Sequence, residues 1–525
     1  MTLQARTHKQ TYLENKLREY IMNIEQPQVR SYIQVHSQDT VAVALENLAK
    51  GSVISINNQD ITLNEDIGRG HKIALSDQLE NDQIIKYGYS IGYLTSAIKA
   101  GDWVHTHNLK TLLSDDDKFS YKPANHALAT ASDEMPTFMG YPRSNGLVGI
   151  RNELWIINSV GCVNSLAQSL VRQCKAQFSE LADDFLAVTH PFGCSQLGDD
   201  LAQTKNLLAS LASNPNAGGV LFLGLGCENN QLSALVADLP SKMSERISYF
   251  NAQEVDDEEA EGMAHIEKLL ATMANDKRVS CPVSKLTLAM KCGGSDGLSG
   301  LTANPLLGRI SEKMAAYGAT VILTETPEMF GAEQVLMNNA ANESVYNDIV
   351  KLVDGFKQYF IENKQPVYEN PSPGNKAGGL TTLEDKSLGA IQKGGNAPVQ
   401  DVIKYGEKAT AKNGVTLLQG PGNDAVSCTA LAASGANMVL FTTGRGTPLG
   451  VPVPTVKISS NSSLATRKKH WIDFDAGQLL RLDKTQDECT QEFFDLLLEI
   501  ASGKATKNEL NQFKEISIWK GGVTL

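Results

Sequence analysis

The chain of 525 residues has no apolar run long enough to cross a membrane. Its longest apolar segments, such as 220–225 and 438–441, have the length of buried strands. The first twenty residues are polar and lack the apolar stretch of a secretory signal. These absences favour a globular protein of the cytoplasm.

Positive charge is also scarce, since the formal net charge is −12. A chain without a basic stripe is a poor match for nucleic acid, because it cannot displace counterions from phosphates. A local group of Lys and Arg can still bind a small anion inside an acidic protein. We therefore expect a small-molecule partner, with no nucleic acid and no membrane.

Cysteine is sparse, with eight in the whole chain. Eight are too few for a disulfide framework in a chain of this length, so they are free to pack or to bind metal. The sequence contains no GxxxxGK[ST] motif and no complete GxGxxG after a strand. The sequence therefore gives no specific indication of nucleotide binding or of nicotinamide chemistry.

The order of apolar segments predicts an α/β multidomain protein. Residues 1–29 read as a helical extension, and residues 30–112 contain short Val- and Ile-rich segments between Gly or Asx breaks, which indicate a small all-β module. Residues 113–137 read as a linker. Buried strands then alternate with helices in a two-lobed, mostly parallel α/β body, divided into 138–278 and 279–525.

Four cysteines follow predicted strands of the body and have glycine as a neighbour. They are Cys162 in SVGCVN, Cys194 in PFGCSQ, Cys227 in GLGCEN and Cys292 in MKCGGSDG. Ligands of open α/β sheets bind beyond the carboxyl ends of the strands, where glycine allows close approach of the backbone. Four thiols that met there would suit a soft or borderline metal such as iron, although small apolar packing explains each cysteine equally well.

Several glycine-rich loops of the body are suited to hold an anion. Such loops present backbone N–H groups to carboxylate or phosphate, and a neighbouring Lys or Arg adds charge. The substrate-binding candidates in them are Ser295, Asp296, Lys376, Asn423, Asp424 and Arg445.

The β module holds the candidate acid–base groups. In WVHTHN, His105 and His107 are two residues apart, and in a strand both would point to the same face and could present two imidazoles to one ion. In GHKIAL and IKYGYSIG, His71, Lys86 and Tyr87 are candidate catalytic acids or bases. A polar strand edge facing water is the simpler alternative for the HxH pair.

Long motifs in a fixed order resemble the altronate and galactarate dehydratase family. GHKIAL, IIKYGYSIGY and WVHTHN resemble its SAF-type β-clip domain, while HPFGCSQLGDD, GLGCENNQ, CGGSDGLSGLTANPLLGR and TTGRGTP resemble its body. The resemblance covers residues 30–525.

The resemblance implies a carbon–oxygen lyase. The WVHTHN string is similar to the altronate branch, which implies loss of water from D-altronate to give 2-dehydro-3-deoxy-D-gluconate in hexuronate breakdown (EC 4.2.1.7). Ferrous iron is the implied cofactor, with Mn²⁺, another divalent ion or an iron–sulfur cluster as alternatives. We also expect a homo-oligomer.

The chemistry explains why these groups belong together. Removal of the weakly acidic C2 proton creates an ene-diolate, which a divalent ion and carboxylate-binding loops stabilise. We expect the β module to dock over the strand ends of the body. Either His105 and His107 hold the ion while His71 or Tyr87 moves protons, or Cys162, Cys194, Cys227 and Cys292 hold it.

Three other functions stay open. Galactarate dehydration or sulfite elimination from sulfolactate would keep the architecture and change the substrate. A sugar-acid sensor without turnover would need a DNA-binding or signalling module, and no basic helix-turn-helix pattern is present.

Overall fold

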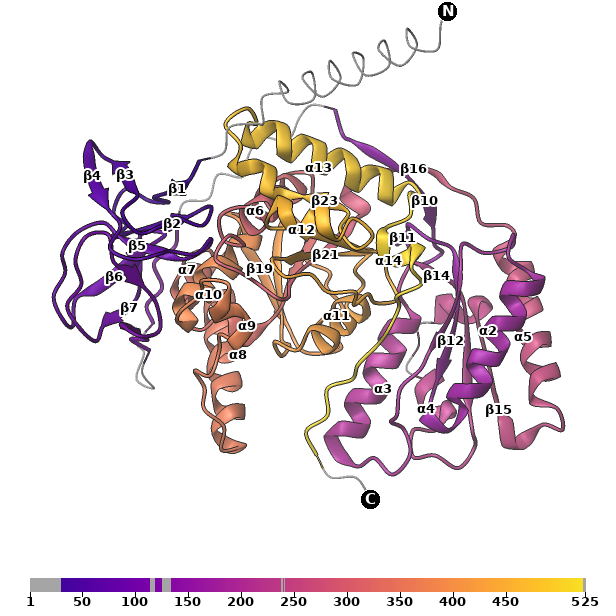
Figure 1. The fold of residues 1–525 in the computed structure, drawn as a ribbon. Helices are drawn as coiled ribbons and strands as arrows, with labels where there is room; N and C mark the ends of the chain where they lie inside the picture. Colours follow the sequence, from indigo (N-terminus) through magenta and orange to yellow (C-terminus); the bar gives the residue numbers. More distant parts are fainter. Residues whose placement is uncertain (1–29, 114–118, 125–133, 238, 240, 523–525) are drawn as a thin grey trace, which may run out of the picture.

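A computed structural model describes residues 30–113, 119–124, 134–237, 239 and 241–522. An N-terminal β module, a central C-terminal lobe and a second lobe are arranged side by side (Figure 1). This arrangement confirms the predicted α/β multidomain class with an antiparallel module in front. The expected helical extension at 1–29 lies outside the described residues.

The N-terminal module is all-β, and every strand pair in it is antiparallel. Positive φ angles at Asn57 and Asn58 provide the tight turn of one hairpin, as do those at Tyr87 and Gly88 in another. The strands are β1 (Tyr32–Ile33), β2 (Val41–Ala44), β3 (Val53–Ile56), β4 (Gln59–Thr62), β5 (Lys72–Ala74), β6 (Gln83–Lys86), β7 (Tyr89–Leu94), β8 (Trp103–Val104) and β9 (Leu109–Lys110).

The second lobe is a four-stranded parallel sheet in the order β13-β12-β14-β15. These strands are β12 (Glu153–Asn158), β13 (Phe185–Val188), β14 (Ala217–Gly224) and β15 (Ile247–Asn251). Helices α2 (Asn164–Gln177) and α5 (Glu258–Met273) cover one face, and α3 (Gly198–Ala212) and α4 (Leu232–Ala237) cover the other (Figure 1).

The C-terminal lobe contains seven parallel strands in the order β19-β20-β18-β17-β21-β22-β23. They are β17 (Thr287–Cys292), β18 (Thr320–Leu323), β19 (Val399–Ile403), β20 (Gly414–Leu418), β21 (Met438–Thr443), β22 (Thr455–Ser459) and β23 (Phe474–Asp475). The surrounding helices are α6 (Ala303–Ala316), α7 (Glu333–Asn338), α8 (Glu343–Glu362), α9 (Pro373–Ala377), α10 (Leu383–Ala390), α11 (Asp424–Ala433), α12 (Ser462–Arg467), α13 (Gln486–Ala501) and α14 (Lys507–Leu510).

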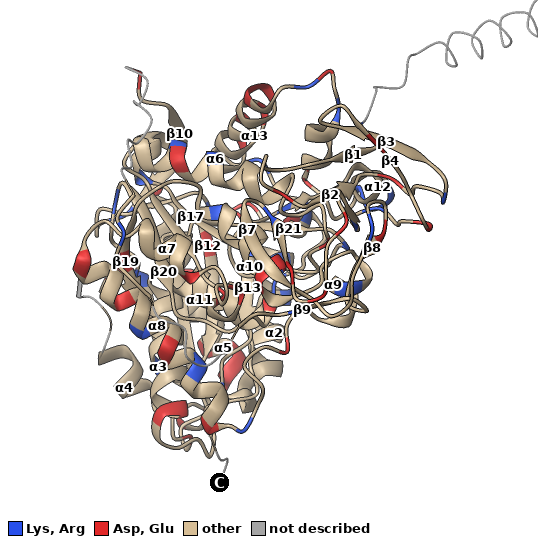
Figure 2. Cartoon of the chain, turned by 90° about the vertical axis from the view of Figure 1, so that its left-hand side faces the viewer, with Lys and Arg blue, Asp and Glu red and all other residues tan. Residues whose placement is uncertain are grey.

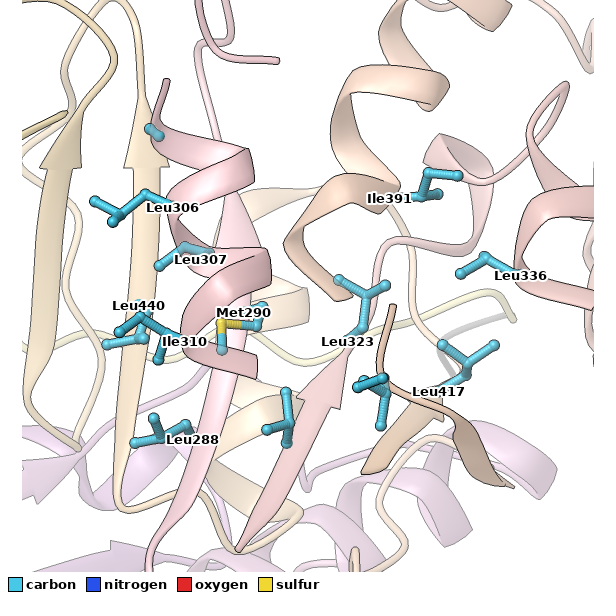
Figure 3. Close-up of a cluster of buried hydrophobic side chains, with 14 of the residues drawn as sticks. Leu288, Met290, Leu306, Leu307, Ile310, Leu323, Leu336, Ile391, Leu417 and Leu440 are labelled. Carbon is cyan, nitrogen blue, oxygen red and sulfur yellow. The ribbon is translucent and has the colours of Figure 1, made fainter. Parts of the chain in front are cut away.

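Two continuous cores hold these parts together. In the first, leucines and isoleucines of α6 pack over β17 and β21 (Figure 3), and buried residues of the β module join the same cluster. In the second, Leu208 of α3 and Trp155 of β12 pack with Leu431 of α11. The cores fix the β module and the second lobe against the C-terminal lobe, so the loops between them have defined positions.

A small antiparallel sheet also joins the two lobes. It contains β10 (Thr137–Pro142), β11 (Val148–Gly149) and β16 (Val279–Pro282).

None of the described helices combines the length and apolar character needed to span a bilayer.

The HxH pair does not lie on a strand, so the expected strand geometry is wrong. Strand β8 ends at Val104, and residues 105–108 form a turn in which Asn108 N–H donates to the His105 carbonyl at 3.0 Å. The Asn108 side chain accepts from His105 N–H at 2.9 Å, which closes the turn from the other side. This side-chain bond replaces the ladder that a longer strand would have needed.

Candidate active site

A cleft of about 740 Å³ opens where the β module meets the C-terminal lobe. Its walls come from both parts of the chain and are rich in glycine and polar side chains. The lining residues are Leu45, Glu46, Asn47, Arg69, Asp296, Ala377, Gly378, Gly444, Arg445, Asn461, Ser463 and Arg467.

Three arginines give this cleft its charge. Arg69 of the module donates to the Ser463 hydroxyl at 2.9 Å, so it reaches across to the C-terminal lobe. Arg445 and Arg467 are exposed, and neither forms an ion pair with any of the described acidic residues. Figure 2 shows basic residues beside α9 and α12. Planar guanidinium groups free of carboxylate partners are well suited to bind the carboxylate of a ligand.

Asp296 lines the same cleft but serves the protein itself. Its carboxylate accepts hydrogen bonds from Ser299 and Ser460, both at 2.9 Å, and from Asn461 at 3.2 Å. These bonds fix the loop after β17 against the loop after β22. Its neighbour Ser295 acts through its carbonyl, which accepts from Asn375 at 2.9 Å.

The other predicted anion-binding residues do not line the cleft. Lys376 is half-buried in α9, directly before the lining residue Ala377. Asn423 caps α11 by accepting from Val426 N–H at 3.1 Å. Asp424 forms an ion pair with Lys291 at 3.0 Å.

A cluster of aromatic and imidazole rings from the module lies next to the cleft. Trp103 Nε1–H donates to His71 Nδ1 at 3.1 Å, and His71 lies against the Ala377 backbone. The His71 and His105 ring centroids are 4.9 Å apart, and Trp103 stacks on His105 at 5.1 Å. Trp103 is also 5.1 Å from His107. The structure thus brings His71 close to His105, while Trp103 contacts both members of the HxH pair.

The imidazoles of His71 and His105 are neutral, because burial and nearby positive charge lower the pKa of both. Burial, followed by the charge of Lys72, lowers the pKa of His71. Burial, then Lys72, His71 and His107, lowers the pKa of His105 to about 3. His105 Nδ1 is buried, and none of the described residues gives it a hydrogen-bond partner. A neutral imidazole with an unpartnered nitrogen has the chemistry of a metal ligand, because protons do not compete for its lone pair.

Below the rings, a buried ion triad joins the module to α10. Asp385 accepts from Lys72 at 2.8 Å and from Lys86 at 2.9 Å, and all three side chains are fully buried. Lys72 also donates to the Gly379 carbonyl at 2.8 Å. Burial would raise the pKa of Asp385, but the two ammonium groups lower it well below its usual range. Lys86 is therefore bound within the interface.

Tyr87 lies in the same interface. A Cβ added at Gly300 would lie 2.3 Å from the Tyr87 hydroxyl, and Gly389 also packs against that hydroxyl. Burial raises the pKa of the Tyr87 phenol, and Lys86 lies 4.6 Å from its ring centroid. The glycines leave just enough room for the phenol against the C-terminal lobe.

A second polar cluster is buried at the carboxyl end of β17. Donor atoms of Cys292, Glu325 and Glu328 all lie within 4.8 Å of one another, which makes this trio a possible metal site. Burial raises the pKa of the Cys292 thiol to about 12. Although burial opposes it, Lys386 followed by two other lysines lowers the pKa of Glu328 to about 2.

Lysines already neutralise this trio. Lys393 lies 2.9 Å from the Cys292 sulfur and 3.3 Å from Glu325, Lys386 lies 2.8 Å from Glu328, and Lys291 pairs with Glu325. A divalent ion would have to displace these ammonium groups. The donor set therefore fits a cation less well than the unpartnered imidazole does.

The other three predicted cysteines do not join Cys292. Cys162, Cys194 and Cys227 are exposed thiols of the second lobe, whereas Cys292 is buried in the C-terminal lobe. The four cysteines expected to converge are thus found in two places. Cys292 is buried beside Lys393, and the other three are exposed on the second lobe.

Matches to known sequences cover the chain from the β module to its end. Residues 30–112 match "Altronate/galactarate dehydratase SAF domain", residues 140–274 match "D-galactarate dehydratase/Altronate hydrolase, second domain", and residues 283–524 match "D-galactarate/Altronate dehydratase, C-terminal". The altronate dehydratase of Escherichia coli K12 is 51% identical over 497 residues, which are 94% of this chain and 100% of the relative. The chain belongs to the altronate/galactarate dehydratase family.

Two further members of this family are informative. The galactarate dehydratase (L-threo-forming) of E. coli K12 is 32% identical over 90% of this chain and 93% of its own length. Two subunits of a (2R)-sulfolactate sulfo-lyase of Chromohalobacter salexigens are also similar to this chain. Its subunit beta is 30% identical over 71% of this chain and 94% of its own length, and its subunit alpha is 35% identical over 15% and 90%.

Sequence reasoning missed several residues of the site. Arg69 and Arg467 line the cleft, Asp385 anchors the module, and Glu325 and Glu328 surround Cys292. For Arg69, a signal was present in GRGH, where glycines flank a basic residue. The positive φ of Glu325, 73°, marks a strained backbone at a buried carboxylate but cannot be read from sequence.

Proposed function

We propose that this chain is a hydro-lyase that removes water from D-altronate to give 2-dehydro-3-deoxy-D-gluconate. The observation that carries the proposal is the cleft lined by Arg69, Arg445 and Arg467, with the neutral imidazole of His71 against the backbone of the lining residue Ala377. The 51% identity with an altronate dehydratase over that enzyme's whole length supports the altronate branch. Cytoplasmic location and a homo-oligomeric state stay predictions.

The arginines act on the carboxylate of the sugar acid. They hold it in a bidentate manner and spread the negative charge that develops when C2 loses its proton. Because Arg69 comes from the module and the other two arginines from the C-terminal lobe, the site is complete only when the two parts are docked.

His71 acts at the departing hydroxyl. Trp103 donates to Nδ1, so the neutral ring carries its proton on Nε2, and the Ala377 backbone also hydrogen-bonds to this ring. A bound substrate oxygen would replace Ala377 as the acceptor of that proton. In the overall reaction C2 loses a proton, the C3–O bond breaks, water leaves, and the enol rearranges to the 2-keto acid.

A divalent metal, which we propose to be Fe²⁺, supplies Lewis acidity to the carboxylate and its neighbouring hydroxyl when bound. We assign its binding to His105, through the unpartnered Nδ1. We propose His107 as a second ligand, since its ring and that of His105 both lie 5.1 Å from Trp103. We expected Lys86 and Tyr87 to carry protons. We now propose that they hold the β module against the C-terminal lobe, because both are buried in that interface.

The reaction is tested by incubating the purified chain anaerobically with Fe²⁺ and, in turn, D-altronate, galactarate and sulfolactate. We expect a 2-keto acid from D-altronate at a rate at least ten times that from galactarate, and no sulfite from sulfolactate. Preferential turnover of galactarate or release of sulfite would replace the altronate assignment by one of the other family activities.

The cleft is tested by Arg445→Gln. Loss of a charge-assisted pair costs about 1.5–3 kcal/mol, so KM should rise roughly 10- to 100-fold. The matched control is Arg309→Gln, because Arg309 is a half-buried arginine that lines a larger cavity of about 1080 Å³ between the module and α6 and is paired with the exposed Asp487. An effect of the Arg309 variant equal to that of the Arg445 variant would move the substrate site to that cavity.

A further inference from the structure

Three adjacent strands of the second lobe each lead into a loop with an exposed Gly-Cys pair. In the order β13-β12-β14, the strands end at Val188, Asn158 and Gly224, and the loops that follow carry Cys194, Cys162 and Cys227. Since the strands are parallel, their carboxyl ends lie at one edge of the sheet. Neighbouring strands are about 4.8 Å apart, so the three loops begin within roughly 10 Å.

Hydrogen bonds lock these three loops to one another. Gly161 N–H donates to the Phe192 carbonyl at 2.9 Å, which joins the first loop to the second. Asn230 N–H donates to the Gly193 carbonyl at 3.1 Å, and Asn230 Nδ2 donates to the Ser159 carbonyl at 2.9 Å. The third loop thus holds both of the others, and the cysteines belong to one rigid surface.

Glycines before two of the cysteines allow this close packing. A Cβ at Gly193 would lie 2.1 Å from the Ser159 carbonyl oxygen, and one at Gly161 would lie 2.9 Å from the His190 carbonyl oxygen. Both distances are too short for a real side chain. The backbones of the first two loops are therefore pressed together at the positions directly before Cys162 and Cys194.

The chemical character of this edge indicates a ligand. The three thiols are exposed and unbridged, whereas the other five cysteines of the chain are buried. The side-chain oxygens of Asn158 and Asn230 are buried at the same edge without a partner among the described residues. Buried acceptors without partners are rare in native proteins, so each points to a missing neighbour.

The spacing of the thiols excludes a single thiolate-bound ion in this arrangement. Sulfurs that share one tetrahedral ion at about 2.3 Å lie roughly 4 Å apart. Among the described residues, the three sulfurs do not all lie within 4.8 Å of one another. A cluster in which each thiolate binds a different iron atom spans a wider set of ligands.

We propose that Cys162, Cys194 and Cys227 bind an iron–sulfur cluster through three thiolates. Four-iron clusters usually have four thiolate ligands, so three leave one iron open to an oxygen ligand. Cys292 is not the fourth ligand, because it lies in the C-terminal lobe and is held by Lys393 at 2.9 Å. This proposal does not depend on the proposed reaction, because its test measures bound iron and sulfide and not turnover.

The test is anaerobic reconstitution of the full chain with ferrous iron, inorganic sulfide and a thiol reductant, followed by gel filtration. We expect iron and acid-labile sulfide to remain bound in nearly equal amounts, with a broad visible absorption of sulfide-to-iron charge transfer. The triple variant Cys162→Ser, Cys194→Ser, Cys227→Ser should lose at least nine-tenths of both elements.

The matched control is Cys174→Ala, which removes a buried thiol of α2 in the same lobe. It should keep the full iron and sulfide content, and circular dichroism should show the same fold for all variants. Retention of iron and sulfide in the triple variant, no sulfide in the unaltered chain, or iron bound without sulfide would each overturn the proposal. Because no turnover is measured, failure here leaves the dehydratase proposal to its own experiment.

Discussion

Asp385 is one carboxylate between two ammonium groups, and all three side chains are sealed from water. The triad has a net charge of +1 and lies close to His105, whose pKa Lys72 helps to lower. Burial and the nearby cation Lys86 lower the pKa of Lys72 itself to about 8, although Asp385 opposes the shift. One residue thus determines both how the module docks and how much positive charge faces the imidazoles.

Removing the carboxylate should cost more than removing one lysine. Asp385→Asn leaves two buried ammonium groups without a counter-charge, a loss of about 3–5 kcal/mol, whereas Lys72→Met leaves a neutral Lys86–Asp385 pair. We expect the Asp385 variant to unfold at the lower temperature and to expose β5 and β6 to hydrogen exchange. An equal or larger effect of Lys72→Met would contradict this.

The contribution of the Asp385 carboxylate to stability depends on pH, because its pKa differs between the folded and the unfolded chain. The folded pKa of Asp385 is depressed below its unfolded value, so the stabilisation is fully present above the unfolded pKa and is lost as the pH falls through the folded pKa. The stability difference between the unaltered chain and Asp385→Asn should therefore begin to shrink below about pH 4.

Single residues were predictable only where local sequence carries their chemistry. Arg445 is flanked by glycines in a loop after an apolar run, and the structure places it in the cleft. Asp385 looked like an ordinary acid of a helix start, three residues after the N-cap Thr382. Its partners Lys72 and Lys86 are 313 and 299 positions away, a pairing that only tertiary structure creates.

At the scale of elements, apolar runs located several buried strands of both lobes, including β12, β14 and β21, because parallel strands covered on two faces must be apolar throughout. The WVHTHN segment was misjudged for the opposite reason. A two-residue strand gives no periodicity, and the Asn108 side chain closes a turn directly after it.

The loop that carries Arg69 and His71 depends on a contact between glycines. Gly70 has φ +87°, and a Cβ there would lie 2.8 Å from the Gly378 carbonyl oxygen of the opposite wall. Cβ atoms at Gly297 and Gly379 would lie 2.0 and 2.1 Å from the Gly70 carbonyl oxygen. Backbone therefore meets backbone between the cleft residue Arg69 and the neighbouring His71.

We expect Gly70→Ala to reduce kcat/KM about 100-fold, because a shift of the loop by about 1 Å misplaces both Arg69 and His71. Gly51→Ala is the matched control, since Gly51 has φ +84° in the same module but no atom within 4 Å of an added Cβ. It carries the same backbone strain without the clash. Equal loss of activity in the two variants would assign the effect to strain in the module.

At the scale of the molecule, the β module is held against the C-terminal lobe by an apolar core and by hydrogen bonds. Its residues Ile84, Ile91 and Leu94 share one apolar core with the C-terminal lobe. Thr382 donates to the Ile91 carbonyl at 2.6 Å, and Glu384 accepts from Leu112 N–H at 2.8 Å. These contacts, together with the Asp385 triad, hold the module to the C-terminal lobe independently of the chain segment that connects them.

Cutting the folded chain should therefore leave the enzyme intact. A protease site placed at the exposed residues 122–123 allows cleavage after folding, and we expect the two fragments to elute together with at least half of the original activity. Combined with Asp385→Asn, the same cleavage should release the module and abolish turnover, because Arg69 and His71 depart with it. Separation of the fragments without that substitution would mean that the linker, rather than the triad and the shared core, holds the cleft closed.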